Sequence, residues 1–350
     1  MNIALITGSG GLVGSESVIF LNKKKFKIIG IDNDSRKYFF GKESGTKNRT
    51  DYLLKTINKF EFHNIDIRNY KKLEKIFKKY NTKIKLIIHT AAQPSHDWAI
   101  KEPLTDFSIN AAGTLNLLEL TRQHSKDCVF IHVSTNKVYG DTPNSLPLLK
   151  KKTRFEIEKK HKFHKGIDES MSIDNSIHSL FGVSKVSADL LAQEYGKNLG
   201  IKTGIFRLGC ITGPAHAGAE LHGFLNYLVK AAINNLNYTI YGYEGKQVRD
   251  NIHSYDLVNC FWNYYKNPKK GEVYNIGGGR ENSCSVLEAI NYIEKKIKKK
   301  LNYKISKINR VGDHIWYVTN NSKFKKDYPK WRLKYNFNEI INQIVDKLKK

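Results

Sequence analysis

Cysteine is sparse in this chain of 350 residues, and long apolar runs are missing. The four cysteines (Cys128, Cys210, Cys260 and Cys284) form no CxxC pair, so neither a disulfide framework nor a metal cluster is predicted. No apolar run reaches the roughly eighteen residues that a membrane span requires, and the first residues lack the pattern of an export signal. We therefore expect a cytoplasmic protein with no membrane partner and no bound metal.

Acidic residues are also scarce, because 33 Asp and Glu stand against 59 Lys and Arg, for a formal net charge of +26. Such a surplus can indicate nucleic-acid binding. The basic runs are dispersed, however, at residues 23–25, 150–152 and 293–300. Lysine predominates, whereas base readout and bidentate phosphate contacts favour arginine. We predict solvated basic faces without a nucleic-acid partner, and a positive field that attracts an anionic small substrate.

Short β-branched segments alternate with helical patterns in the first part of the chain, which predicts an α/β fold. We expect a Rossmann-type doubly wound parallel sheet in residues 1–210, with an inserted loop region at about 140–176. Residues 211–350, where the alternation becomes irregular, are expected to form a smaller mixed α/β substrate-binding lobe. Expected strands cover residues 2–7, 26–32, 60–66, 84–91, 128–135 and 203–209, with short ones at 238–243 and 272–278; expected helices include 12–23, 69–80, 111–124 and 179–200.

A glycine-rich loop, TGSGGLVG, follows the first expected strand and opens a helix. Glycines at positions 8, 11 and 14 allow a tight turn, close approach of a pyrophosphate and close packing of the helix on the sheet. Asp32 ends the next strand, where a carboxylate receives a ribose 2′-hydroxyl and repels a 2′-phosphate. A glycine turn without a ligand is the alternative, but the complete order of strand, loop, helix, strand and acid predicts NAD.

Further cofactor contacts are expected after the third, fourth and fifth strands. Asp66 can accept a hydrogen bond from the adenine amino group, although a lone acid after a strand is often only a turn or helix cap. The small residues of HTAAQ end the fourth strand. The predicted NAD-binding residues are Gly8, Gly11, Leu12, Val13, Gly14, Asp32, Asn33, Asp66, Ile67, Ala91, Ala92, Gln93, Asn110, Ser134 and Lys185.

Seven motifs occur in a recognisable order: TGSGGLVG, DIRN, HTAAQ, SINAAGTLNLLE, STNKVYGD, FGVSK and RDNIHSYD. With them the chain resembles the extended short-chain dehydrogenase/reductase family, which acts on sugar nucleotides. Within it, GIDESMSID, GYEGKQVRDNIHS and YNIGG make the chain similar to the CDP-paratose 2-epimerase (CDP-tyvelose epimerase) group. This resemblance implies oxidation of a sugar C2 hydroxyl by NAD, a transient ketosugar, and return of the hydride to the opposite face.

The resemblance also assigns substrate contacts. It places Thr135 beside the nicotinamide and the reacting hydroxyl. Dehydratases of the family carry an Asp-Glu pair in the next two places, whereas this chain has Asn136 and Lys137, so dehydration is not expected. Arginines at two positions are expected to hold a diphosphate, although either could instead form a surface salt bridge. The predicted substrate-binding residues are Thr135, Asn136, Lys137, His222, Gln247, Arg249 and Arg310.

The family's catalytic YxxxK pair is altered here to Phe181 and Lys185. Phenylalanine cannot carry a proton. Either another group takes the proton, or the chain binds NAD without the usual turnover. Candidates for the substitute are His96, then Tyr139, Lys137 and His178, and histidine has the most suitable intrinsic pKa. The predicted catalytic residues are Thr135, Lys185 and His96.

Two rival functions stay open beside a nucleotide-sugar epimerase. One is a dehydrogenase on the same scaffold that releases a ketosugar. The other is a non-catalytic protein that binds NAD or a nucleotide sugar, a reading that Phe181 motivates. The resemblance further implies a homodimer or homotetramer that pairs through the helices at 111–124 and 179–200.

Overall fold

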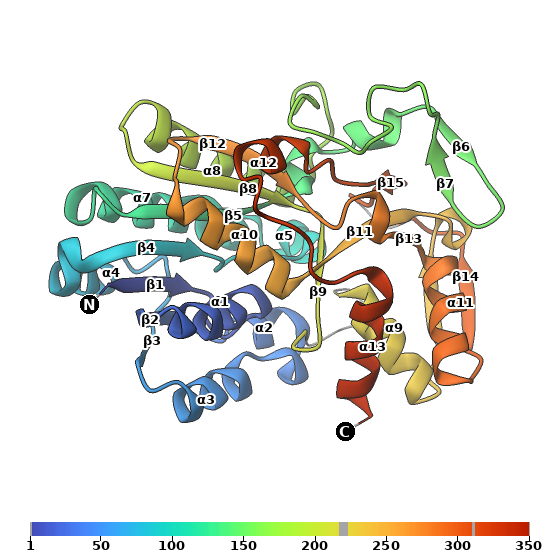
Figure 1. Ribbon diagram of the computed structural model, residues 1–350, viewed down its shortest axis with the longest axis horizontal. Coiled ribbons are helices and arrows are strands. Elements are labelled where there is room, and N and C mark those ends of the chain that lie inside the picture. Colours follow the sequence, from blue (N-terminus) through green and yellow to red (C-terminus); the bar gives the residue numbers. More distant parts are fainter. Residues whose placement is uncertain (1, 217–222, 310–311, 350) are drawn as a thin grey trace. The chain divides into compact units, whose positions relative to one another are not determined.

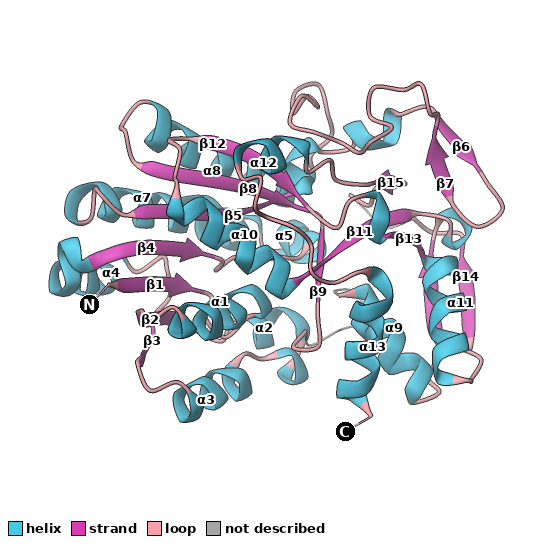
Figure 2. Cartoon of the chain, viewed as in Figure 1, coloured by secondary structure: helices cyan, strands magenta, loops and turns pink. Residues whose placement is uncertain are grey.

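The computed structural model describes residues 2–216, 223–309 and 312–349. The chain forms two compact units, which are drawn in Figures 1 and 2. The first unit comprises residues 1–138, 179–207 and 258–274, and the second comprises residues 139–178, 208–257 and 275–350. The chain therefore passes between the units several times, after residues 138, 178, 207, 257 and 274.

A seven-stranded sheet with the order β12-β8-β5-β4-β1-β2-β3 forms the centre of the first unit. β1 pairs in parallel with β2 and β4, and the neighbouring pairs β2/β3 and β4/β5 are parallel as well. The order reverses between β1 and β4, and ligands of doubly wound folds bind at such a reversal, beyond the carboxyl ends of the strands. The predicted fold class is confirmed. The strands are β1 (Ile3–Thr7), β2 (Lys27–Asp32), β3 (Phe60–Asn64), β4 (Ile84–His89), β5 (Val129–Thr135), β8 (Lys202–Leu208) and β12 (Glu272–Ile276).

The central strands are buried because their apolar residues run almost without interruption. All five residues of β1 are buried, and in β4 only Lys85 is exposed. Such runs are typical of parallel strands covered by helices on both faces, and Figure 2 shows the strands of this sheet running among helices. The helices are α1 (Leu12–Lys23), α2 (Arg36–Phe40), α3 (Lys47–Thr56), α4 (Tyr70–Tyr80), α5 (His96–Lys101), α6 (Pro103–Phe107), α7 (Gly113–His124), α8 (Ser179–Lys197) and α10 (Ser254–Lys266).

The edge strand β12 lies in this sheet, although the sequence placed it in the C-terminal lobe. Its tyrosine, Tyr274, is fully buried, and its ring centroid lies 5.8 Å from that of Phe206 on β8. Gly196 near the end of α8 allows the approach, since a Cβ there would lie 2.2 Å from the backbone nitrogen of Gly271. Packing between segments distant in the sequence therefore decided this placement.

The second unit contains smaller sheets and a helical cluster of its own. β11 pairs with β13, β15 and β9, β10 pairs with β14, and β6 with β7 forms an antiparallel pair. Capping boxes at Ser285 and Asn336 satisfy backbone groups at the starts of α11 and α13. The elements are β6 (Leu148–Lys150), β7 (Phe155–Ile157), β9 (Cys210–Thr212), α9 (Phe224–Ile233), β10 (Tyr238–Tyr241), β11 (Val248–His253), β13 (Ser283–Ser285), α11 (Val286–Ile297), β14 (Tyr303–Ser306), β15 (Trp316–Tyr317), α12 (Ser322–Asp327) and α13 (Phe337–Leu348).

Candidate active site

The glycine loop turns tightly between β1 and α1. Gly8 adopts the left-handed conformation (φ +68°), and its N–H donates to the carbonyl of Ile31 at 2.7 Å. A Cβ on Gly14 would lie 2.0 Å from the carbonyl oxygen of Gly8, so no side chain fits there. Gly11 caps α1, which begins with Leu12 and Val13. Helix starts that follow such a glycine turn can bind an anionic group through their backbone N–H groups.

Asp32 at the end of β2 lies beside this loop. One of its carboxylate oxygens accepts from Gly10 N–H at 2.9 Å. The other accepts from Asp34 N–H at 2.8 Å and from the Thr46 hydroxyl at 2.9 Å. These bonds hold an anionic side chain next to the glycine-rich turn, where the sequence predicts an acceptor for a ribose hydroxyl.

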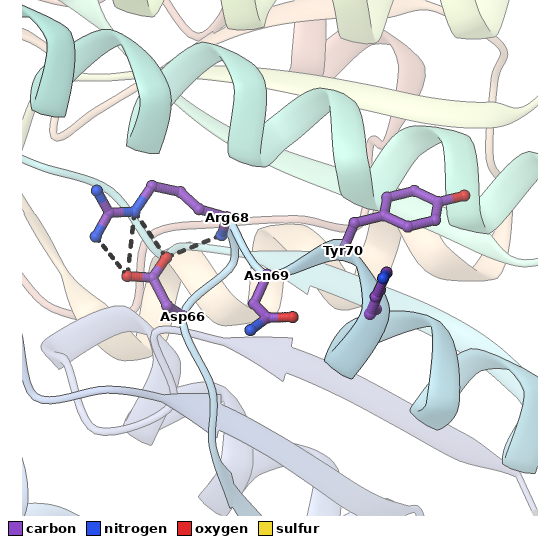
Figure 3. Close-up of a pocket in the computed structure, with 5 residues that line it drawn as sticks. Asp66, Arg68, Asn69 and Tyr70 are labelled. Atoms are coloured by element: carbon purple, nitrogen blue, oxygen red, sulfur yellow. Dashed lines mark hydrogen bonds and ion pairs between the residues drawn. The ribbon is translucent and has the colours of Figure 1, made fainter.

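Asp66 follows β3 and is held by two side chains. Its carboxylate accepts bonds from Nε and Nη2 of Arg68, the shortest at 2.7 Å (Figure 3). It also accepts a bond from the side-chain amide of Asn33 at 3.1 Å. Burial by itself raises the pKa of Asp66, but the hydrogen bonds from Arg68 outweigh it and the pKa is lowered. Asp66 and Arg68 line a pocket of about 470 Å³ together with Asn69, Tyr70 and Lys71. The neighbouring Ile67 is buried instead.

Asn110 links the segment after β4 to α8. It lies in a π-helical turn, Ser108–Ala112, and such turns are frequent at functional sites. Its side-chain oxygen accepts a hydrogen bond from Gln93 N–H at 2.9 Å, and its amide nitrogen lies 3.0 Å from both Asp106 Oδ1 and Ser184 Oγ.

The small residues that follow β4 lie against the end of β1. Ala91 donates its N–H to the Thr7 hydroxyl at 3.3 Å. Ala92 comes next in the sequence, before Gln93.

Lys185 on α8 is almost completely buried, with 6% of its surface exposed. Burial lowers its pKa to about 8, although the carboxylates of Asp106 and Asp189 act in the opposite direction. One turn further along α8, Asp189 accepts from the Ser134 hydroxyl at 2.6 Å. The end of β5 and the lysine-bearing helix are thereby connected.

The residues after β5 form a short 3₁₀ turn, Asn136–Tyr139. The Thr135 hydroxyl lies 3.3 Å from the N–H of Lys137, which donates to it, and 3.5 Å from the side-chain oxygen of Asn136. Neither of the two residues after Thr135 is acidic. This turn therefore offers no carboxyl pair for eliminating water.

Phe181 and His96 lie together in the first unit. Their ring centroids are 4.7 Å apart, with an angle of 57° between the ring planes. His96 begins α5, and its Nδ1 lies 3.0 Å from the hydroxyl oxygen of Ser179. The sequence named His96 as a candidate from its intrinsic chemistry, and the structure places it against the altered residue.

Two of the alternative proton acceptors, Tyr139 and His178, form hydrogen bonds within the second unit. The Tyr139 hydroxyl is fully buried and donates to Asn275 Oδ1 at 2.8 Å. His178 Nε2 donates to the carbonyl of Ile173 at 2.7 Å. Both residues belong to the second unit, and these bonds account for both side chains as parts of its fold.

Two of the substrate-binding residues expected in the second unit, Gln247 and Arg249, lie just before and at the second position of β11. Arg249 pairs with Asp313 and donates from Nη1 to the Val248 carbonyl at 2.7 Å. The Gln247 amide donates to the Tyr241 carbonyl at 3.2 Å. His222 and Arg310 lie outside the described residues.

Residues 4–277 match the NAD dependent epimerase/dehydratase family. The chain belongs to this family. It is similar to CDP-paratose 2-epimerase of Salmonella typhi, with 35% identity over 299 residues, 83% of each chain. A putative UDP-glucose 4-epimerase of Methanocaldococcus jannaschii is 29% identical over 81% of this chain and 79% of its own. The structure of UDP-glucuronic acid 4-epimerase from Bacillus cereus, in complex with UDP-glucuronic acid and NAD, superposes with a TM-score of 0.78 at 23% identity, covering 99% of both chains.

As a member of the epimerase/dehydratase family, the protein is an enzyme that uses NAD and acts on sugar nucleotides. Its first unit fits that cofactor, because the turn that Gly8 and Gly14 make possible lies beside the carboxylate of Asp32. No helix in residues 2–216, 223–309 and 312–349 has the length and apolar character needed to cross a bilayer.

Several residues around the family's lysine escaped the sequence analysis. Asp106 and Ser184 bind Asn110, Asp189 binds Ser134, and Arg207 binds Asp189. Each of these contacts except that between Asn110 and Asp106 joins segments at least 18 residues apart. The available signals were local: Asp189 stands four residues after Lys185 and Asp106 four residues before Asn110, and residues at that spacing share a helix face.

Proposed function

We propose that this enzyme inverts C2 of a CDP-activated sugar, with a CDP-paratose 2-epimerase-like activity. The proposal rests mainly on the turn after β5, where Asn136 and Lys137 follow Thr135 and provide no carboxyl pair for dehydration. The 35% identity to CDP-paratose 2-epimerase supports the choice of substrate class.

In this proposal the first unit binds the cofactor, and NAD supplies the reversible two-electron oxidation that lets an unactivated stereocentre invert. The glycine loop receives the pyrophosphate, and Asp32 receives the adenosine ribose. Lys185 binds the nicotinamide ribose, while Thr135 hydrogen-bonds the reacting hydroxyl. The remaining cofactor contacts predicted from the sequence complete this site.

For the adenine we propose a contact with Asp66 that is shared with Arg68. The carboxylate already accepts bonds from this guanidinium and from Asn33. An adenine amino group that binds here would add to a set of donors already in place. The proposed site therefore holds adenine beside a neutralised carboxylate.

Arg249 and Arg310 are proposed to hold the substrate diphosphate, with Gln247 and His222 as further contacts. Guanidinium groups suit phosphate oxygens because they donate two parallel hydrogen bonds. Arg249 is paired with Asp313 in this structure, so a diphosphate that binds Arg249 exchanges one anionic partner for another.

We also propose a homodimer or homotetramer built on α7 and α8. These helices carry exposed apolar side chains: Leu115 on α7, and Leu180, Val183 and Leu190 on α8, each between 39% and 48% exposed. An apolar face of this kind is typical of a protein–protein interface. We propose that a second copy of the chain packs against it.

Incubation with NAD and CDP-paratose, followed by NMR of the sugar, tests the function. We expect conversion to the C2 epimer, CDP-tyvelose, and the reverse reaction from the same mixture. Equal or faster turnover of UDP- or dTDP-sugars would overturn the choice of nucleotide. Stoichiometric release of a ketosugar would indicate the dehydrogenase, and binding without turnover would indicate the non-catalytic protein that Phe181 motivates.

A further inference from the structure

The imidazole of His96 packs against the residue that stands at the family's tyrosine position. That residue, Phe181, is buried, with 6% exposed. The two ring centroids are 4.7 Å apart. A tyrosine at this position would carry its hydroxyl one bond beyond the ring that His96 contacts. An imidazole can exchange a proton near neutral pH, whereas a phenyl ring cannot.

Ser179 holds this imidazole in a defined orientation. It adopts φ +58°, a conformation uncommon for residues other than glycine, and unusual conformations of this kind cluster at functional sites. Its Oγ lies 3.0 Å from His96 Nδ1 and accepts from the N–H of Gly182 at 3.3 Å. If Nδ1–H is the donor to Ser179, the lone pair of the imidazole is on Nε2. This tautomer is the one able to accept a proton at Nε2.

The short helix that carries His96 is fixed at its other side as well. Trp98 Nε1 donates to the Phe39 carbonyl at 2.6 Å, and the two rings pack with centroids 5.6 Å apart. Ser95 caps the helix start through the N–H of Trp98, and Ala99 is completely buried. His96 is therefore held on a supported element, as proton transfer requires.

We propose that His96 is the catalytic proton acceptor of this enzyme, and that Ser179 positions it. This inference rests on the proposed function. In the forward step the C2–H bond breaks and its electron pair leaves with the hydrogen to NAD, the hydroxyl proton passes to Nε2 of His96, and a C2=O bond forms. In the return step the carbon receives its hydrogen and electron pair on the opposite face, and His96 gives the proton back to the oxygen.

The helices that pack against α5 carry ionisable residues: Lys185 on α8, Asp106 on α6, and Arg36 and Lys37 on α2; α5 itself carries Asp97 and Lys101. In the proposed step, the ammonium of Lys185, on the helix that carries Phe181, disfavours a second positive charge on His96 and so favours return of the proton from the imidazolium.

Turnover of CDP-paratose should identify the role of His96. We expect His96→Gln to lower kcat by about two to four powers of ten, with KM and NAD affinity nearly unchanged. His96→Gln should also remove the acid limb of the pH profile that His96 produces, and adding Phe181→Tyr to that variant should recover part of the lost turnover. His124→Gln, the same change at the end of α7, should turn over like the unmodified enzyme.

Nitrogen NMR of histidine-labelled protein gives a readout independent of turnover. The His96 signals, assigned by their loss in His96→Gln, should show the Nδ1–H tautomer, and Ser179→Ala should shift the balance toward Nε2–H. Normal kcat in a folded, NAD-binding His96→Gln variant would overturn the inference while the proposed function stood. A predominant Nε2–H tautomer would overturn it too. If the unmodified enzyme turned over no nucleotide sugar, both proposals would fall together.

Discussion

Asp189 on α8 and Arg207 on β8 form a buried bidentate ion pair, with Arg207 Nε and Nη2 at 3.0 and 2.9 Å from the two carboxylate oxygens. Their side chains are only 1% and 6% exposed. The same carboxylate accepts from Ser134 on β5. One side chain thus connects two strands of the sheet to the helix that carries Lys185.

Replacing Asp189 by alanine should strongly destabilise the first unit. Arg207 would be left with an uncompensated buried charge, and breaking a buried pair typically costs about 3 to 5 kcal/mol. Urea denaturation measures the change. Glu194→Ala, at an exposed position of the same helix, is the control and should fall within about 0.5 kcal/mol of the unmodified protein. Equal stability of the two variants would contradict a structural role for the pair.

The stability of the protein should rise with pH between about 8 and 10 because of Lys185. Burial lowers the pKa of this lysine to about 8, whereas an unfolded lysine titrates at about 10.4. Between these values the unfolded chain binds more protons than the folded one, so raising the pH favours folding. Below about pH 8 Lys185 is charged in both the folded and the unfolded chain, so the free-energy cost of burying its charge no longer changes with pH.

Comparison with Lys185→Met isolates this contribution from the other lysines. Urea denaturation of both proteins across the alkaline range should show that the unmodified protein gains on the order of 3 kcal/mol relative to the variant. Parallel pH curves for the two proteins would show that the folded pKa of Lys185 is not lowered.

Asp32→Ala should weaken NAD binding and reduce the preference for NAD over NADP. The change removes the acceptor for the ribose hydroxyl together with the charge that repels a 2′-phosphate. Calorimetric titration with both cofactors measures the effect, and Asp51→Ala, on the exposed surface of α3, is the matched control. An unchanged ratio of the two affinities would remove Asp32 from the cofactor site.

Arg249→Ala should weaken CDP binding by roughly ten- to a hundredfold, because a charge-assisted arginine contact is worth about 1.5 to 3 kcal/mol. Arg122→Ala, which removes an exposed arginine paired with Glu119, should leave the affinity unchanged. Titration of both variants with CDP measures the two affinities. Equal affinities would place the diphosphate elsewhere.

A charge on the apolar face of α8 should dissociate the proposed oligomer. Val183 and Leu190 are seven residues apart and both nearly half exposed, so Val183→Lys combined with Leu190→Lys places two like charges on each copy. Light scattering should show a monomer that keeps its NAD affinity. An unmodified protein that is already monomeric at working concentration would rule out this interface.

The architecture of the first unit and the chemistry of its glycine loop could be predicted from local sequence patterns. Alternating apolar segments predict a parallel sheet because these periodicities are local, and the glycines and Asp32 are close enough in sequence to be interpreted together. The replacement of the family's tyrosine by Phe181 was also visible in the sequence, because the tyrosine and lysine positions lie within one helical turn.

Contacts between residues far apart in the sequence became known from the folded chain alone. It brought β12 into the central sheet, neutralised Asp66 with Arg68, paired Arg249 with Asp313, and set His96 against Phe181 with Ser179 on Nδ1. A histidine is equally compatible with a loop, a core or an active site until its neighbours are known. Its function depends on distances of a few ångströms between side chains 83 residues apart in the chain, and local sequence patterns contain no information about such distances.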